Sequence, residues 1–182
     1  YEAQRKVDRG RIFTADGVVL ARSVAQTRDG HTTFRRVYPQ GDLAPHVVGY
    51  ASPQLGSSGV EAAYNEFLGG DYGSAPLAQR LELDTKQGAD VQLTIDSRIQ
   101  RASNSALAAT GASGSVVALD PTSGRILAMA SNPGFDLRDV AENYAQITSR
   151  SGSPLLNRAT QSRQPPGSTF KVISAMGLEQ AA

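Results

Sequence analysis

Two apolar runs joined by a short turn constrain the fold more than any other feature of this chain. The segment SVVALDPTSGRILAMAS, residues 115–131, places turn-forming residues 120–124 between the runs. Both runs are apolar at successive positions, which is typical of strands covered on both faces. The segment therefore predicts a β-hairpin in a sheet with helices on each side. In a complete domain we expect its large apolar side chains to be buried, and without covering helices to form an exposed patch: Val117, Leu119, Ile126, Leu127 and Met129.

A change in composition near residue 90 suggests two parts. Residues 1–89 are rich in Gly, Arg and Gln, and their short apolar runs, such as 17–21 and 33–38, predict short strands and loops. Residues 90–182 are more regular, with the strand-like VQLTID followed by a helical pattern. The chain is therefore expected to be an α+β protein, with an N-terminal region of short strands and one helix.

That one helix is predicted in GSSGVEAAYNEFLGG, residues 56–70. Its apolar residues repeat at helical spacing and predict a single apolar face, formed by Val60, Ala63, Tyr64, Phe67 and Leu68. Ser57 or Ser58 would begin the helix and Gly69 would end it. No Lys-Ser/Thr pair follows the glycines, so a phosphate-binding loop is not indicated.

A second helix is predicted after Asp96, whose carboxylate is suited to cap SRIQRASNSALAAT. Ile99, Ala102, Ala106 and Leu107 are expected to share its packed face. Beyond the hairpin, residues 132–157 are polar and interrupted by Pro and Gly, with one weak helical pattern at 139–147.

Charge and composition exclude several classes of function. The 18 basic and 17 acidic residues nearly cancel, and no basic stripe with interleaved aromatics exists, so no nucleic-acid partner is expected. The chain has no cysteine, which excludes disulfides and thiol catalysis, and with only two histidines a structural zinc site is excluded too. No apolar run approaches the roughly 18 residues of a membrane span.

A serine and a lysine near the end of the sequence carry the chemistry. Pro165, Pro166 and Gly167 interrupt the chain before a helical pattern, so Ser168 is expected at a helix N-terminus, where its backbone N–H could stabilise an oxyanion. Lys171 lies three residues later on the same helix face, within reach of the Ser168 hydroxyl. A partly desolvated lysine can accept the proton of a serine, so the pair suits acyl transfer.

Ser-x-x-Lys alone is a common pattern, so the surrounding segments decide its meaning. In order and spacing, five of them resemble the signatures of class B penicillin-binding proteins: RGRIFTADGVVLA, GSSGVEAAYNEFLGG, VQLTIDSRIQ, GSVVALDPTSGRILAMASNPGFD and NRATQSRQPPGSTFKV. The likeness is strongest to the actinobacterial penicillin-binding protein A type, where a phrase like Arg36-Val37-Tyr38-Pro39 also occurs.

This resemblance implies a peptidoglycan D,D-transpeptidase on the extracytoplasmic face of the membrane, anchored by an N-terminal helix absent here. Ser168 would be the acylated nucleophile, Lys171 its general base and the Ser168 N–H an oxyanion donor. The substrate would be a stem peptide ending in D-Ala-D-Ala, which β-lactams mimic, and no metal or organic cofactor is implied. A membrane glycosyltransferase, a division or elongation complex and a second copy of the protein are the expected partners.

The resemblance also predicts what this chain lacks. Residues 1–89 would form a pedestal, or dimerisation-like domain, and residues 90–182 only the opening of the transpeptidase domain, since the family's Ser-x-Asn and Lys-Thr/Ser-Gly motifs are missing. We therefore expect the chain alone to be inactive. In addition, residues 14–17 read TADG where the family commonly has Asp-Arg-x-Gly, so this loop departs from the family's pattern.

Two other functions remain open, and one ion pair is expected to stabilise the N-terminal region. The chain could instead be a non-catalytic interaction or dimerisation module of a cell-wall synthesis complex. Hydrolysis, as in serine β-lactamases and related sensors, is less favoured because those proteins generally lack the long upstream region. Within the pedestal, Arg9 and Glu61 are expected to form a bidentate ion pair between strand and helix, with Arg11 as the alternative partner.

Overall fold

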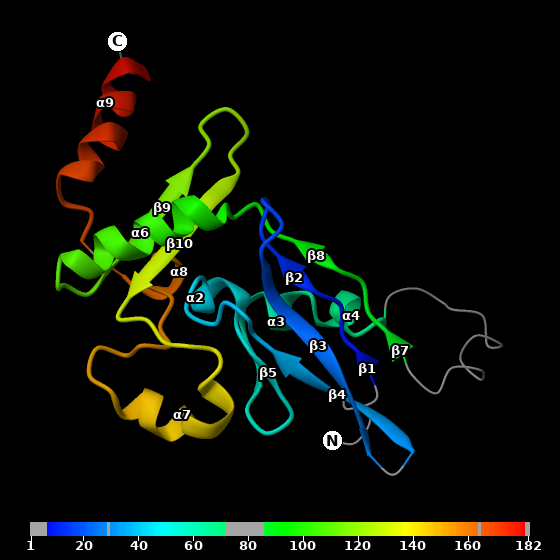
Figure 1. The fold of residues 1–182 in the computed structure, drawn as a ribbon. Helices are drawn as coiled ribbons and strands as arrows, with labels where there is room; N and C mark the ends of the chain where they lie inside the picture. Colours follow the sequence, from blue (N-terminus) through cyan, green and yellow to red (C-terminus); the bar gives the residue numbers. More distant parts are fainter. Residues whose placement is uncertain (1–6, 29, 72–85, 164, 181–182) are drawn as a thin grey trace.

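A computed structural model describes residues 7–28, 30–71, 86–163 and 165–180, and they form an α+β arrangement (Figure 1). The largest sheet of this described part has the strand order β4-β3-β2-β8. Its strands are β2 (Ile12–Phe13), β3 (Val19–Arg28), β4 (His31–Val37) and β8 (Val91–Gln92). β3 and β4 form a long antiparallel ribbon, whereas β8 runs parallel to β2.

Smaller elements surround this sheet. The strand β1 (Val7–Asp8) pairs with β7 (Lys86–Gln87), and β5 (Ala51–Ser52) forms a hairpin with β6 (Gly56–Ser57). The short helix α2 (Pro45–Val48) precedes that hairpin and α3 (Gly59–Ala63) and α4 (Asn65–Leu68) follow it. In Figure 1, α3 and α4 lie behind the strands β2 and β3.

The prediction of a single helix in residues 56–70 is wrong, because the helix is interrupted at Tyr64. Its backbone has φ −110° and ψ 26°, and it separates α3 from α4. The break turns Tyr64 and Phe67 outward, with 46% and 50% of their surfaces exposed, while Leu68 is buried. Ser58 precedes α3 without capping it, since its hydroxyl accepts a hydrogen bond from Tyr50 N–H at 3.2 Å. Gly69 ends α4 as expected.

The hairpin expected in residues 115–131 is confirmed. The strands β9 (Gly114–Leu119) and β10 (Ile126–Asn132) are antiparallel, and the Asp120 carboxylate accepts a hydrogen bond from Thr122 N–H at 3.0 Å in the turn. Ala128 and Ala130 are buried, whereas Val117 and Leu119 are 42% and 58% exposed. The expected exposed apolar patch is thus present only on β9, because Ile126, Leu127 and Met129 of β10 are half-buried.

The helix α6 (Ser97–Ala109) is capped by Asp96 as predicted, because the carboxylate accepts from Arg98 N–H at 2.9 Å and Ile99 N–H at 3.3 Å. Its expected packed face is wrong except at Leu107: Ile99, Ala102 and Ala106 are exposed. The residues buried instead are Ser97, Gln100, Ser103 and Leu107. The helix therefore meets the hairpin through a mainly polar face.

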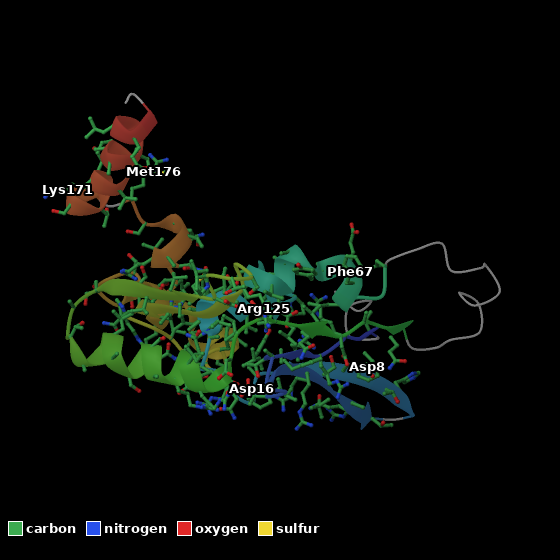
Figure 2. The ribbon with its side chains drawn as sticks, turned by 90° about the horizontal axis from the view of Figure 1, so that it is seen from above. Asp8, Asp16, Phe67, Arg125, Lys171 and Met176 are labelled. Atoms are coloured by element: carbon green, nitrogen blue, oxygen red, sulfur yellow. The ribbon has the colours of Figure 1, made fainter. Side chains whose placement is uncertain are left out.

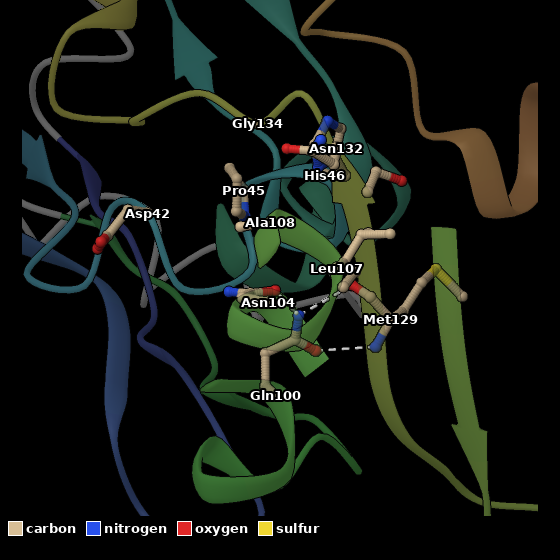
Figure 3. A pocket seen from close by; sticks show the side chains of 12 residues that line it. Asp42, Pro45, His46, Gln100, Asn104, Leu107, Ala108, Met129, Asn132 and Gly134 are labelled. Atoms are coloured by element: carbon tan, nitrogen blue, oxygen red, sulfur yellow. Dashed lines mark hydrogen bonds between the residues drawn. The ribbon is translucent and has the colours of Figure 1, made fainter. Parts of the chain in front are cut away.

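Gln100 explains why that face is polar. Its Oε1 accepts from Met129 N–H at 2.8 Å and its Nε2 donates to Met129 C=O at 3.1 Å (Figure 3). Nearby, Asp96 N–H donates to Leu127 C=O at 2.9 Å. These bonds occupy backbone groups of β10 that do not pair with β9, so that edge of β10 is closed to a further strand at these residues.

One buried cluster joins both parts of the sequence. It includes Ile12, Leu20 and Val48 from the N-terminal region together with Leu137 and Ile147. Ile147 lies on α7 (Val140–Ser149), which coincides with the weak helical pattern at 139–147. Beyond α7 the chain forms α8 (Arg158–Gln161), the 3₁₀ turn η1 (Gly167–Thr169) and α9 (Phe170–Gln180). None of the helices in the described ranges has the length and apolar character needed to cross a bilayer.

Candidate active site

Ser168 lies at the start of a helix, as its sequence context predicts. Gly167 has a positive φ of 54°, which glycine adopts without strain, and it begins the turn η1 that leads directly into α9. The first backbone hydrogen bond of this turn runs from Thr169 N–H to Pro166 C=O at 3.2 Å. The N–H of Ser168 comes before that bond and has no acceptor within the helix, which is the arrangement that favours an anion beside it.

Lys171 follows in the first turn of α9, and both functional side chains are exposed. Among the described residues, neither side chain makes a hydrogen bond or ion pair with another residue. The whole helix α9 stands apart from the rest of the molecule, with Lys171 and Met176 on it well away from the hairpin (Figures 1 and 2). Its large apolar side chains are between 53% and 73% exposed: Phe170, Val172, Ile173, Met176 and Leu178.

This arrangement supplies only part of an acyl-transfer site. A nucleophile, a candidate base and one N–H donor are present, but no described side chain forms a second wall opposite Ser168. Acyl transfer also requires a further oxyanion donor and groups that hold the substrate. Lys171 is exposed, so the described residues do not enclose its amine beside Ser168.

The ion pair expected in the N-terminal region is present, with a different geometry. Arg9 Nε donates to Glu61 Oε2 at 2.8 Å, and Arg36 Nε donates to Glu61 Oε1 at 2.6 Å. Arg9 is therefore not bidentate to the carboxylate, and its Nη2 donates instead to the Glu61 backbone C=O at 2.8 Å. Sequence reasoning missed Arg36, although its place in an apolar-flanked strand was a usable signal. Arg11 pairs with Asp90, with 2.6 Å between Nη2 and Oδ2.

The loop of residues 14–17 fastens the N-terminal sheet to α6. The Asp16 carboxylate accepts from Ser97 N–H at 2.9 Å and from the Ser97 hydroxyl at 2.7 Å. Hydrogen bonds from the hydroxyls of Thr14 and Ser97 hold the pKa of Asp16 well below its usual range. The aspartate of this atypical TADG loop thus has a structural partner that its sequence did not predict.

Comparison with known proteins agrees with this architecture. The family model described as the penicillin-binding protein A dimerisation domain matches residues 9–91, and that of the penicillin-binding protein transpeptidase domain matches residues 114–182. The chain therefore belongs to the penicillin-binding proteins. The likeness to the penicillin-binding protein A type that its motifs indicate is confirmed.

Individual relatives support the same assignment. The chain is 40% identical over 181 residues to the peptidoglycan D,D-transpeptidase PbpA of Mycobacterium tuberculosis, an alignment that covers 91% of this chain and 36% of the relative. The structure of penicillin-binding protein A from M. tuberculosis in an imipenem acyl-enzyme complex matches with a TM-score of 0.82 and 35% identity, covering 100% of this chain and 44% of that one.

A D,D-transpeptidase domain structure from Eggerthella lenta matches with a TM-score of 0.75 and 47% identity, over 92% of this chain and 36% of that one. The chain thus spans between about a third and a half of the length of these relatives. The likeness to the M. tuberculosis structure covers the whole chain, including the segment with Ser168.

Proposed function

We propose that this chain is the opening part of a peptidoglycan D,D-transpeptidase that works through an acyl-enzyme on Ser168. The observation that carries the proposal is the position of Ser168 at the start of η1 and α9, with its N–H unbonded within the helix and Lys171 one turn later. Relatives named peptidoglycan D,D-transpeptidase, and the acyl-enzyme complexes of M. tuberculosis penicillin-binding protein A, support it.

In the proposed reaction, the Ser168 oxygen attacks the carbonyl carbon between the two terminal D-alanines of a stem peptide. Lys171 takes the hydroxyl proton, and the backbone N–H of Ser168 donates to the oxyanion that forms. Collapse of this intermediate breaks the peptide bond and releases D-alanine, which leaves with a proton. The amine of a neighbouring stem peptide then attacks the ester, forms the cross-link and frees Ser168. A β-lactam would acylate the same oxygen when its ring amide opens.

The remaining parts of the proposal concern the whole protein. Residues 1–89 serve as its pedestal, and residues 90–182 begin its transpeptidase domain. The protein acts at the extracytoplasmic face of the cell membrane, held by an N-terminal helix, beside a glycosyltransferase in a division or elongation complex. Arg9, Glu61 and Asp96 support the fold and do not take part in the chemistry.

Labelling with a fluorescent penicillin tests this function. Because only one oxyanion donor is described beside Ser168, we expect this chain alone to be labelled at least about 100-fold more slowly than M. tuberculosis penicillin-binding protein A, since loss of one donor costs about 10² to 10³ in rate. The longer protein that continues this chain through the missing motifs should be labelled rapidly, and its Ser168→Ala variant not at all. Rapid labelling that survives Ser168→Ala would overturn the assignment of the nucleophile.

A second function, self-association through the N-terminal region, is favoured by the match of residues 9–91 to a dimerisation domain. Light scattering after gel filtration at several concentrations distinguishes it from a purely catalytic role. A mass that rises from monomer to dimer supports self-association, and a mass that stays monomeric at every concentration contradicts it.

A further inference from the structure

A groove runs along the outer edge of the β3–β4 ribbon. A cavity of about 580 Å³ lies between β4 and the β5–β6 hairpin, and it is lined by residues 33–36 on one side and by 51–54 with 56–57 on the other. Successive residues of a strand point to opposite faces. Four successive residues of β4 line the cavity together with Ser23 and Gln26 of β3, so the cavity reaches the edge of β4 and also extends over the β3–β4 ribbon.

The edge of β4 in this groove is open to pairing. Within the described residues β4 pairs with β3 alone and is the last strand of its sheet. Such an edge presents unpaired N–H and C=O groups, and an extended peptide that adds as a further strand satisfies them. The cavity volume falls within the range of about 300–1,000 Å³ that is usual for ligand sites.

The charge of the groove favours an acidic occupant. Among the described residues that line it, four are charged: three are arginines, Arg9, Arg35 and Arg36, and one is acidic, Asp71. Arg9 and Arg36 share the single buried carboxylate of Glu61 beneath the groove. Arg36 is 7% exposed, and in the part of the chain that the structure describes its Nη2 is buried without a hydrogen-bond acceptor. A guanidinium group in this position is suited to a carboxylate.

We propose that this groove binds an extended segment of a partner protein that pairs with the edge of β4 and directs an Asp or Glu side chain to the arginines. The edge supplies affinity that does not depend on sequence, and the arginines select a segment with a carboxylate. The site is formed mainly by the N-terminal region, with Ala141 of α7 also lining it, and its binding does not require the chemistry of Ser168, so it goes beyond the proposed transpeptidase function. It gives the pedestal a specific docking surface.

The test uses the ¹⁵N-labelled chain and the peptide acetyl-Val-Thr-Glu-Thr-Val-amide, with the same peptide carrying Gln in place of Glu as the neutral counterpart. We expect the Glu peptide to shift the backbone amide signals of residues 33–36 and 51–57. The Gln peptide should bind at least about fivefold more weakly, because hydrogen bonds to an ionised group are about twice as strong as neutral ones. Sodium acetate, which cannot pair with a strand, should leave these signals in place.

Two charge reversals provide the matched variants. Arg35→Glu alters an exposed lining residue outside the Glu61 cluster and should weaken binding of the Glu peptide at least about tenfold. Arg22→Glu changes an exposed arginine of β3 outside the groove and should alter binding less than about twofold. The proposal is overturned if millimolar Glu peptide shifts none of these signals, if both peptides bind equally, or if both variants behave alike. Concentration-dependent shifts of the same signals without peptide would instead identify a second copy of the chain as the occupant. Penicillin labelling, measured separately, reports on the proposed transpeptidase function alone.

Discussion

Glu61 shows how a single residue can hold several segments in place. Its side chain has no exposed surface, and each of its two oxygens accepts from a different arginine, Arg9 before β2 and Arg36 on β4. A buried charge is tolerated only when its partners are well placed, and removal of one partner leaves the others uncompensated. The carboxylate therefore connects the first strands of the chain to α3.

Replacement of Glu61 should be costly for this reason. Glu61→Gln leaves two guanidinium groups, one of them buried, without their carboxylate, so we expect the free energy of unfolding to fall by about 3 kcal/mol or more. Urea denaturation measures the change. Asp90→Asn, which removes the exposed partner of Arg11, is the control and should cost less than about 1 kcal/mol. Equal losses in the two variants would show that burial of Glu61 contributes nothing.

His46 gives the chain a predictable response to acid. Burial lowers its pKa below the usual 6.5, and its Nε2 lies 2.7 Å from Pro154 C=O, to which the neutral ring can donate. The folded chain therefore binds fewer protons at His46 than the unfolded chain, so the free energy of unfolding should decrease as the pH falls below about 6.5 and through the lower pKa of the folded state.

Urea denaturation between pH 7.5 and pH 5 checks this response. His46→Gln keeps a hydrogen-bond donor but cannot titrate, so it should flatten the pH dependence. His31→Gln, which removes the other histidine on the exposed surface, is the matched control. If the pH dependence of stability persists in His46→Gln and disappears in His31→Gln, the prediction is wrong, because His31 and not His46 then causes it.

At the scale of elements, the sequence predicted what local chemistry determines. Asp96 caps the helix that follows it, and residues 120–124 form the turn between β9 and β10, because these contacts lie within a few residues of one another. The break at Tyr64 and the polar face of α6 were missed. Gln100 is buried only because it meets Met129, 29 residues away, and no pattern along the helix indicates that contact. Ser168 was found because its motif is local too.

The exposed side of β9 should govern association of this chain. Val117→Lys together with Leu119→Lys replaces two exposed apolar side chains, so the free energy of unfolding should change by less than about 0.5 kcal/mol. Light scattering at rising concentration should show less association than in the parent chain, because the apolar patch is removed. Unchanged association would place the contact elsewhere, for example on α9, where Ile173→Lys is the matched variant.

For the whole molecule, the composition of the sequence suggests two parts, whereas the buried core joins residues from both of them. The composition changes near residue 90, and residues 135–147 were expected in the second part. In the structure, Phe135, Leu137, Val140 and Ile147 pack in one core with Ile12 and Leu20. The sequence alone could not show this, because which apolar segments share a core depends on how the chain returns on itself.

Because the N-terminal region and α7 share one core, we expect a core substitution to reduce the protection of their amides from hydrogen exchange together. Leu137→Ala removes a buried side chain and should lower the free energy of unfolding by about 2–5 kcal/mol. Hydrogen exchange should then accelerate to the same extent in β3 and in α7. Leu178→Ala, on exposed α9, should affect neither element. Faster exchange in α7 alone would mean that the two parts unfold independently.

The closed edge of β10 has a consequence for assembly. The Gln100 amide and Asp96 N–H occupy that side of the hairpin, so a strand from another copy can extend the β9–β10 sheet only beside β9. A sheet with two free edges can add strands from further copies at both edges and form fibres. A sheet with one free edge has none left once two copies pair through that edge. Pairing of two hairpins through β9 would therefore be self-limiting, because the combined sheet of the two hairpins would have no free edge, whereas the edge of β4 belongs to a separate sheet.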